Sequence, residues 1–150
     1  HCLFLLSCFN KQHNNLYDAV SECLMKKIIL SLIFCFGSLF GTDWQNYNDA
    51  KKIQQKNSKI IMMYVKRTNC RYCINMQKDV FDDNEMSQWI KERFIPVMLN
   101  LDTNILPLSV NVSMTPSFYF INKNQEIIKT IPGSWNIDDF KLLTKNIKEL

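Results

Sequence analysis

The chain has 150 residues, of which 47% are hydrophobic and 12% aromatic, so its length and composition fit one globular domain with a substantial core and exclude two full domains. The formal net charge is +4, and because the basic residues are scattered rather than clustered, this charge gives no reason to expect a nucleic-acid partner. Gly and Pro are few, at 3 and 4, and no stretch is repetitive, which excludes a repeat architecture or a long flexible linker.

The first 41 residues contain a pattern typical of a secretory signal peptide. A short basic segment, Met25-Lys26-Lys27, precedes an apolar run over residues 28–41 that is too short to span a bilayer comfortably. We predict a signal peptide over residues 25–41, cleaved near Gly41, with an uncleaved membrane anchor as the alternative. We interpret residues 1–24 as a wrongly assigned upstream segment and Met25 as the initiator. The alternative is a genuine extension whose apolar stretch, residues 3–9, joins a membrane hairpin.

Only two cysteines belong to the predicted mature domain, residues 42–150. Four of the six precede it, and Cys70 and Cys73 follow in the run Cys70-Arg71-Tyr72-Cys73. A bridge between these two closes so small a loop that it adds little chain-entropy stabilisation. The pair is therefore better explained by reactivity than by a structural disulfide framework. The four earlier cysteines are Cys2, Cys8, Cys23 and Cys35.

The first half of the mature domain predicts helix, strand, helix. Apolar residues recur at helical spacing over residues 43–57, with Asp43 placed to cap the helix start. Residues 59–66 form a nearly continuous apolar run of strand length, which predicts a central strand covered on both faces. A helix then begins at the cysteines, and its apolar positions are Ile74, Met76, Val80 and Phe81.

The second half predicts a helix, three strands and a final helix. The helix spans residues 84–93, and the strand over residues 94–101 has Pro96 near its start, where a missing N–H donor is tolerated. A turn or short helix over residues 102–112 leads to a strand over residues 117–122, a hairpin turn, and a returning strand over residues 126–130. Asn136 starts the last helix, whose apolar positions are Ile137, Phe140, Leu142, Leu143 and Ile147. Alternating helices and strands followed by a hairpin indicate an α/β fold with a mixed sheet.

The position of the cysteine pair favours redox chemistry over a zinc site. Zinc sites of this kind need about four ligands, and the predicted mature region offers no histidine and no third cysteine. Between a buried strand and a helix start, the helix dipole and free backbone N–H groups stabilise the Cys70 thiolate, which is the attacking species. Cys73 can then resolve the mixed disulfide. The rival interpretation is a binding module that delivers a soft metal such as Cu(I) through the two thiolates.

The order of strand, cysteine pair, helix, strand, Thr115-Pro116, hairpin, Gly133 and helix resembles the thioredoxin superfamily over residues 43–149. It looks closest to the periplasmic branch with the C-terminal domain of transmembrane disulfide-interchange reductases and the thioredoxins of sulfur-oxidation systems. The resemblance implies a thioredoxin fold, with a central mixed sheet of about four to five strands flanked by helices. It also implies a cis Pro116 against the cysteine pair and a backbone at Thr115 that pairs with an extended substrate segment.

Two other residues of the motif are candidate substrate-binding residues, Arg71 and Tyr72. Arg71 either lowers the pKa of Cys70 electrostatically or is a solvated charge of little effect. Tyr72, like Thr115, resembles the residue that disulfide isomerases carry at this place. The chain departs from thioredoxins at Asn69, where they have tryptophan, and at Tyr64, where they have a buried aspartate that serves the second cysteine.

These patterns, together with what the resemblance implies, predict an extracytoplasmic protein-disulfide oxidoreductase. Cys70 is the expected nucleophile, Cys73 the resolving thiol and Pro116 the shaping residue, with no dissociable cofactor and no metal. Expected partners are protein thiols and disulfides and a membrane redox partner, and we expect a monomer in the periplasm. Trp135, after Gly133, is expected near the active-site face, in reach of a partner, whereas Phe118, Tyr119 and Phe120 are expected in the core.

Overall fold

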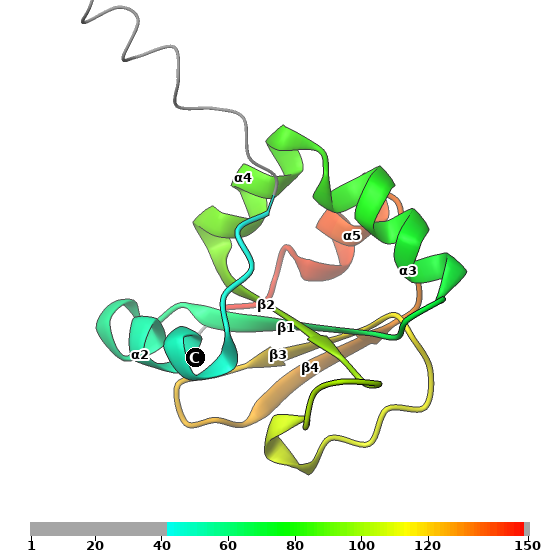
Figure 1. Ribbon diagram of the computed structural model, residues 1–150. Helices are drawn as coiled ribbons and strands as arrows, with labels where there is room; N and C mark the ends of the chain where they lie inside the picture. Colours follow the sequence, from blue (N-terminus) through cyan, green and yellow to red (C-terminus); the bar gives the residue numbers. More distant parts are fainter. Residues whose placement is uncertain (1–41, 149–150) are drawn as a thin grey trace, which may run out of the picture. The chain divides into compact units, whose positions relative to one another are not determined.

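A computed structural model describes residues 42–148, which fold around one four-stranded sheet in the order β2-β1-β3-β4 (Figure 1). The central strand β1 runs parallel to β2 and antiparallel to β3, and β3 pairs antiparallel with β4. The predicted α/β class with a mixed sheet is therefore confirmed. The strands are β1 (Ile60–Lys66), β2 (Phe94–Asn100), β3 (Ser117–Ile121) and β4 (Ile127–Pro132).

Within residues 42–148, four α-helices and two short helical segments surround this sheet. Asp83 caps the helix over residues 84–93, and the predicted limits of that helix are confirmed. The helix that starts at the cysteines widens into a π-helix, in which the Asp82 N–H donates to the Gln77 carbonyl at 2.9 Å. The helices are α2 (Tyr47–Asn57), α3 (Arg71–Met76), the π-helix η1 (Gln77–Phe81), α4 (Asn84–Arg93), the 3-10 turn η2 (Pro107–Ser109) and α5 (Ile137–Thr144).

Strand β1 is buried on both faces because its side chains alternate between two apolar layers. One face, with Met62 and Tyr64, packs beneath α3, α4 and α5, which lie together on one side of the sheet (Figure 1). The other face, with Met63 and Val65, packs against α2 through Ala50. This double coverage explains the continuous apolar run in the sequence and fixes where the end of β1, and so the cysteine loop, must lie.

Two predicted helix limits are wrong. Asp43 does not cap the first helix, which begins at Tyr47 with Asn46 as its cap. Residues before Asn46 are extended instead, because the Gln45 N–H donates to the Pro96 carbonyl at 2.8 Å and adds a short bridge beside edge strand β2. The last helix ends at Thr144, before Ile147.

The last helix also differs from the prediction in which side chains it buries. Phe140 is fully buried, whereas Leu142 lies on the outer side of α5 with 59% of its surface exposed. Ile147, beyond the end of α5, still packs against the core. The apolar pattern therefore located the helix correctly, but it included Leu142, which is exposed, and Ile147, which follows the end of the helix.

An aromatic cluster fills the layer between the sheet and the helices α3, α4 and α5. The Tyr64 ring stacks on the Phe118 ring at a centroid distance of 5.1 Å, and Phe81 meets Tyr64 at 5.0 Å. Trp44 and Phe140 close the cluster at its two ends. Phe118, Tyr119 and Phe120 are all buried, so the prediction that they are core residues is confirmed.

The predicted signal peptide, residues 25–41, and the upstream residues 1–24 lie outside the residues that the structure describes. Between residues 42 and 148, no helix is both long enough and apolar enough to cross a membrane.

Truncation of Phe118 at the centre of the aromatic cluster should be costly. Phe118→Ala removes a fully buried ring, and we expect the free energy of unfolding to fall by about 3–5 kcal/mol. Urea denaturation followed by tryptophan fluorescence measures this change. Leu142→Ala, at an exposed position, is the matched control and should shift stability by less than about 0.5 kcal/mol. Equal losses in the two variants would contradict the assignment of Phe118 to the core.

Tyr64 should make the fold sensitive to alkaline pH. Burial raises the pKa of Tyr64, so above about pH 10 the unfolded chain ionises this phenol while the folded protein keeps it neutral. The unfolded state then binds fewer protons, and stability falls as pH rises. Tyr64→Phe should lower stability at neutral pH by about 1 kcal/mol through the lost hydrogen bond, but it should weaken the alkaline decline.

Urea denaturation of the oxidised protein across this alkaline range provides the measurement. Tyr72→Phe is the control, because Tyr72 is 64% exposed and its phenol gains little from folding. The same alkaline decline in the Tyr64 variant and in the wild-type protein would show that Tyr64 is not its cause.

Candidate functional site

A tight loop between β1 and α3 delivers Cys70 to the start of a helix. Asn69 adopts a left-handed conformation with φ of 58°, which asparagine tolerates better than most residues. The Thr68 N–H donates to the Asp102 carboxylate at 2.7 Å, and the Asn100 amide donates to the Thr68 hydroxyl at 3.0 Å. The loop is therefore held to the end of β2, and the direction in which the chain enters α3 is fixed.

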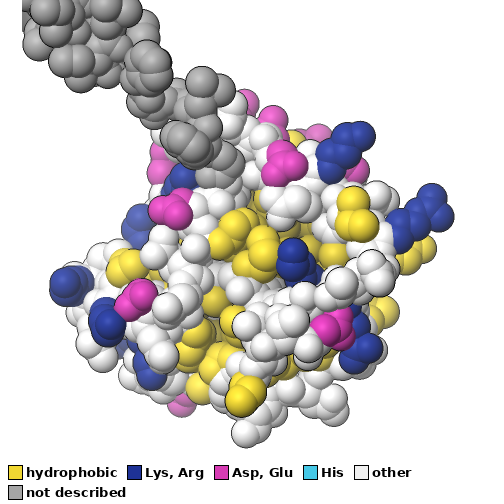
Figure 2. All heavy atoms as spheres, in the orientation of Figure 1, with side chains coloured by type: hydrophobic (Ala, Val, Ile, Leu, Met, Phe, Trp, Pro, Cys, Tyr) yellow, Lys and Arg dark blue, Asp and Glu magenta, His cyan; other side chains and the backbone are white. Residues whose placement is uncertain are grey.

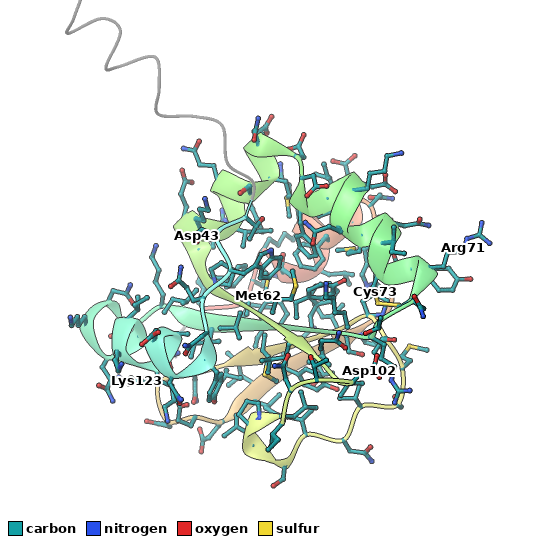
Figure 3. All side chains as sticks on the ribbon, in the orientation of Figure 1. Asp43, Met62, Arg71, Cys73, Asp102 and Lys123 are labelled. Atoms are coloured by element: carbon teal, nitrogen blue, oxygen red, sulfur yellow. A yellow bond between two sulfur atoms is a disulfide. The ribbon has the colours of Figure 1, made fainter. Side chains whose placement is uncertain are left out.

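Cys70 and Cys73 form a disulfide, with their Cα atoms 5.2 Å apart. Figure 3 shows this sulfur pair at the start of α3, beside the label of Cys73. Cys70 is half-buried, whereas only 3% of the Cys73 surface is exposed. An external thiolate or disulfide can therefore approach the sulfur of Cys70, while the sulfur of Cys73 is shielded behind it.

The sulfur of Cys70 accepts hydrogen bonds from two directions. Cys70 is the N-cap residue of α3, and the backbone N–H of Cys73 donates to the Cys70 Sγ atom at 3.1 Å. The Thr115 hydroxyl approaches the same sulfur at 3.5 Å from the opposite segment. When the disulfide is reduced, these donors and the helix N-terminus favour a thiolate at Cys70 over a protonated thiol.

The Thr115–Pro116 peptide bond is cis, as the resemblance implied. Pro116 is buried, and its carbonyl accepts the N–H of Gly133 at 2.8 Å. The Thr115 carbonyl oxygen lies 3.7 Å from the sulfur of Cys70. The structure therefore brings together four of the six predicted site residues, Cys70, Cys73, Thr115 and Pro116.

The other two predicted residues, Arg71 and Tyr72, lie on the exposed side of α3. The Arg71 side chain extends away from the fold in Figure 3. Water surrounds a charge in this position and screens its effect on a neighbouring sulfur. Of the two interpretations of Arg71, the geometry favours the solvated charge.

Tyr64 contacts the active-site helix from the core side. Its hydroxyl donates to the Cys73 carbonyl at 3.3 Å, and its ring is fully buried. Burial raises the pKa of Tyr64, so the phenol stays neutral and acts as a hydrogen-bond donor. Sequence reasoning treated this position only as a missing carboxylate. Its place on a buried strand, six residues before Cys70, is the signal that could have revealed the contact.

Trp135 lies beside the same helix, at the turn that follows β4. Its backbone N–H donates to the Met76 sulfur at 3.4 Å, and its indole N–H donates to the Pro132 carbonyl at 3.1 Å. Gly133, with φ of 97°, makes this turn. Trp135 is half-buried and packs against the core, so its side chain presents only part of its surface to solvent.

A cavity of about 360 Å³ opens next to Cys73, between the β1–α3 loop and the side of α3 and η1. Its lining combines basic, amide and hydroxyl side chains with one carboxylate and with Cys73 and the apolar Ile74, and none of its lining residues belongs to the Thr115–Pro116 segment. The basic residues that line it are Lys66, Arg67 and Lys78.

Residues 42–148 contain no cluster of three or more His, Cys, Asp or Glu side chains arranged to hold a metal ion. The two cysteines of this region are joined to each other in the disulfide Cys70–Cys73.

Comparisons with known proteins agree on the fold. The model of the thioredoxin-like domain family matches residues 47–148. No curated protein sequence matches the chain.

Three solved structures illustrate the likeness. A thioredoxin from Thermus thermophilus is 26% identical, with a TM-score of 0.60 over 71% of this chain and 87% of that one. A DsbH oxidoreductase is 16% identical, with a TM-score of 0.59 over 73% and 89%. The C-terminal domain of DsbD from Neisseria meningitidis, in its oxidised form, is 14% identical, with a TM-score of 0.54 over 67% and 91%. The last two likenesses are at identities that establish the fold alone. Because the family model covers more than half of the chain, the chain belongs to the thioredoxin-like family, with the fold and the cysteine pair of a thiol-disulfide oxidoreductase.

Proposed function

We propose that this protein exchanges its Cys70–Cys73 dithiol and disulfide with protein substrates outside the cytoplasm. The observation that carries the proposal is the placement of a half-exposed Cys70 sulfur at the start of α3, bonded to a buried Cys73 and flanked by Thr115. One sulfur is accessible to attack and the other is positioned to resolve, which is the arrangement that two-step thiol-disulfide exchange requires.

The reaction in the reducing direction has two balanced steps. The Cys70 thiolate attacks one sulfur of a substrate disulfide, so a mixed disulfide forms and the first substrate thiolate leaves. Cys73, as a thiolate after losing its proton to solvent, then attacks the sulfur of Cys70, and the second substrate thiolate leaves. The substrate has gained two electrons and the Cys70–Cys73 bridge has formed. The same steps in reverse oxidise a substrate dithiol, and the potential of the pair against its partners sets the direction.

The surroundings of Cys70 favour a polypeptide substrate over a small thiol. Exposed apolar side chains stand next to the cysteines and to Thr115 along the chain, with exposed fractions of 64% for Tyr72, 63% for Ile74 and 53% for Met114. Exposed apolar side chains of this kind are suited to cover the apolar side chains of a partner. The backbone at Thr115, beside Cys70, is placed to pair with an extended segment of that partner, which gives affinity with little demand on sequence. In this proposal Pro116 shapes the segment, and Tyr72 and Arg71 border the docked chain.

The extracytoplasmic location rests on the signal-peptide pattern over residues 25–41. In the bacterial periplasm thiols are kept oxidised, so a reductase there draws its electrons through a membrane partner, whereas an oxidant passes electrons to one. We propose such a membrane redox partner for this chain.

Replacement of either cysteine should abolish turnover, but the two variants should differ in whether a mixed disulfide with the substrate accumulates. Cys70→Ser removes the nucleophile, so reduction of an insulin disulfide should fall to the uncatalysed rate and no mixed disulfide should form. Cys73→Ser leaves the nucleophile but removes the resolving thiol, so Cys70 should accumulate as a mixed disulfide with the substrate. Turnover assays and mass spectrometry of the trapped species measure both outcomes.

A Cys70→Ala variant is the control for any residual reactivity of the serine hydroxyl. The proposal fails if the wild-type protein exchanges no disulfide in either direction. Tight binding of Cu(I) by the reduced wild-type protein, lost in both serine variants and combined with no exchange, would instead support the metal-delivery alternative.

Loss of the Thr115 hydroxyl should make Cys70 less reactive below neutral pH. Thr115→Val keeps the shape of the side chain but removes a donor that lies 3.5 Å from the Cys70 sulfur. A typical hydrogen bond contributes about 0.5–1.5 kcal/mol, so we expect alkylation of reduced Cys70 at mildly acidic pH to slow by about two- to tenfold. The rate of alkylation against pH, measured with iodoacetamide, tests this.

Thr130→Val is a control on neighbouring strand β4, because Thr130 is exposed and pairs with Tyr119 instead of facing the cysteines. It should leave the alkylation profile unchanged. An unchanged profile in Thr115→Val as well would show that the hydroxyl does not stabilise the thiolate.

A further inference from the structure

We propose that the cavity next to Cys73 receives a carboxylate side chain of the substrate polypeptide, so that the protein prefers substrates with acidic residues near the reactive cysteine. This inference rests on the proposed function and adds to it the chemical class of the substrate. It concerns the second side of the site, away from the Thr115–Pro116 segment.

The cavity carries an excess of positive charge, with three basic side chains and one carboxylate in its lining. Lys66, Arg67 and Lys78 line it, and within residues 42–148 none of these three side chains forms an ion pair or hydrogen bond with another group. Figure 2 shows basic side chains on the right-hand side of the molecule, the side on which Figure 3 labels Arg71 at the start of α3.

The acidic groups nearby are already engaged. Asp82 is the one carboxylate among the described residues that line the cavity, and it accepts a hydrogen bond from the Gln77 amide at 2.7 Å. Asp102, below the loop, accepts the Thr68 N–H at 2.7 Å. These hydrogen bonds come from neutral donors and leave the carboxylates charged, but three cations still outnumber the one carboxylate of the lining, and the excess attracts an external anion.

The cavity also has donors that suit a carboxylate. The Asn69 side chain lines it without a hydrogen-bond partner among the described residues, so its amide is available beside the three cations. Hydrogen bonds from cations and amides to a carboxylate are stronger than those between neutral groups. At about 360 Å³, the space holds one or two side chains but not a folded surface.

The cavity lies close enough to the sulfur pair for an acidic side chain of the docked substrate to enter it. Cys73 itself lines the cavity, while the sulfur of Cys70 faces Thr115 at 3.5 Å. A substrate chain whose cysteine is bonded to Cys70 then lies between the two regions. Its backbone can follow the Thr115 side while a nearby side chain enters the cavity. A Glu or Asp there is attracted, and a Lys or Arg is repelled.

The test uses one disulfide peptide in three versions, with Glu, Gln or Lys two residues from the reactive cysteine. We expect kcat/KM at low ionic strength to follow the order Glu, Gln, Lys, with about three- to tenfold between the ends. The differences should shrink near physiological salt because exposed charges are then screened within about 8 Å. The triple variant Lys66→Gln, Arg67→Gln, Lys78→Gln should treat the three peptides alike.

The matched control is Lys129→Gln, Lys145→Gln, Lys148→Gln, which removes the same charge from exposed positions outside the cavity. This control should keep the preference for the Glu peptide. The single variants Arg67→Gln and Lys78→Gln, each with partial loss of preference, keep the test valid if the triple variant is poorly folded.

A binding measurement separates failure of this inference from failure of the proposed function. Versions of the peptides with serine in place of cysteine are titrated into the oxidised protein, and backbone amide shifts are followed by NMR. The Glu peptide should shift the amides of Lys66, Arg67 and Lys78, and the Lys peptide should not. If the protein turns over none of the disulfide peptides but still binds the Glu peptide selectively, the proposed function is wrong and the inference about the cavity is supported.

Three results would overturn the inference. The first is equal turnover and equal binding of the three peptides by the wild-type protein. The second is a preference for the Glu peptide that survives in the cavity variants. The third is faster turnover of glutathione disulfide than of the Glu peptide, lost in the cavity variants, because the cavity would then serve a small anionic thiol.

Discussion

The contact on which the site depends is the hydrogen bond from the Cys73 N–H to the sulfur of Cys70, across the first turn of α3. It makes a cysteine the N-cap of a helix, a place usually held by Ser, Thr, Asp or Asn. Everything else in the site fixes this cap from outside: the loop anchored on Asp102 sets the entry, Tyr64 holds the first turn from below, and Thr115 approaches the same sulfur from across. The reactive atom is thus a structural element of the helix that carries it.

Much of this arrangement could be predicted from the sequence. The apolar run of residues 59–66 identified a strand with two covered faces. Because the two cysteines follow this strand and precede apolar positions at helical spacing, they were predicted at a helix start. These predictions succeeded because they rest on local patterns, periodicity and cap chemistry, which the tertiary structure did not overrule. The cis bond at Pro116 followed from family resemblance, not from any local pattern.

Other features depend on contacts between distant segments and leave little trace in the sequence. Asp43 and Asn46 are both good caps, and the choice between them is made by Gln45, whose N–H is taken by Pro96 on β2. The cavity combines Lys66 and Arg67 with Lys78, which stand far enough apart in sequence to look like scattered surface charges. The role of Tyr64 was missed for the same reason, since its partner is a backbone carbonyl nine residues away.

The phenol beneath Cys73 has one more consequence. Among the described residues, the buried polar side chains are uncharged, and none is a carboxylate or an amine. The interior face of the sulfur pair thus holds no acid–base group that changes its charge at physiological pH, because Tyr64 stays neutral there. Protons taken up or released during the redox cycle belong, on that face, to the sulfurs alone. Exchange of electrons and exchange of protons at this centre are therefore coupled through two atoms, without a buried relay.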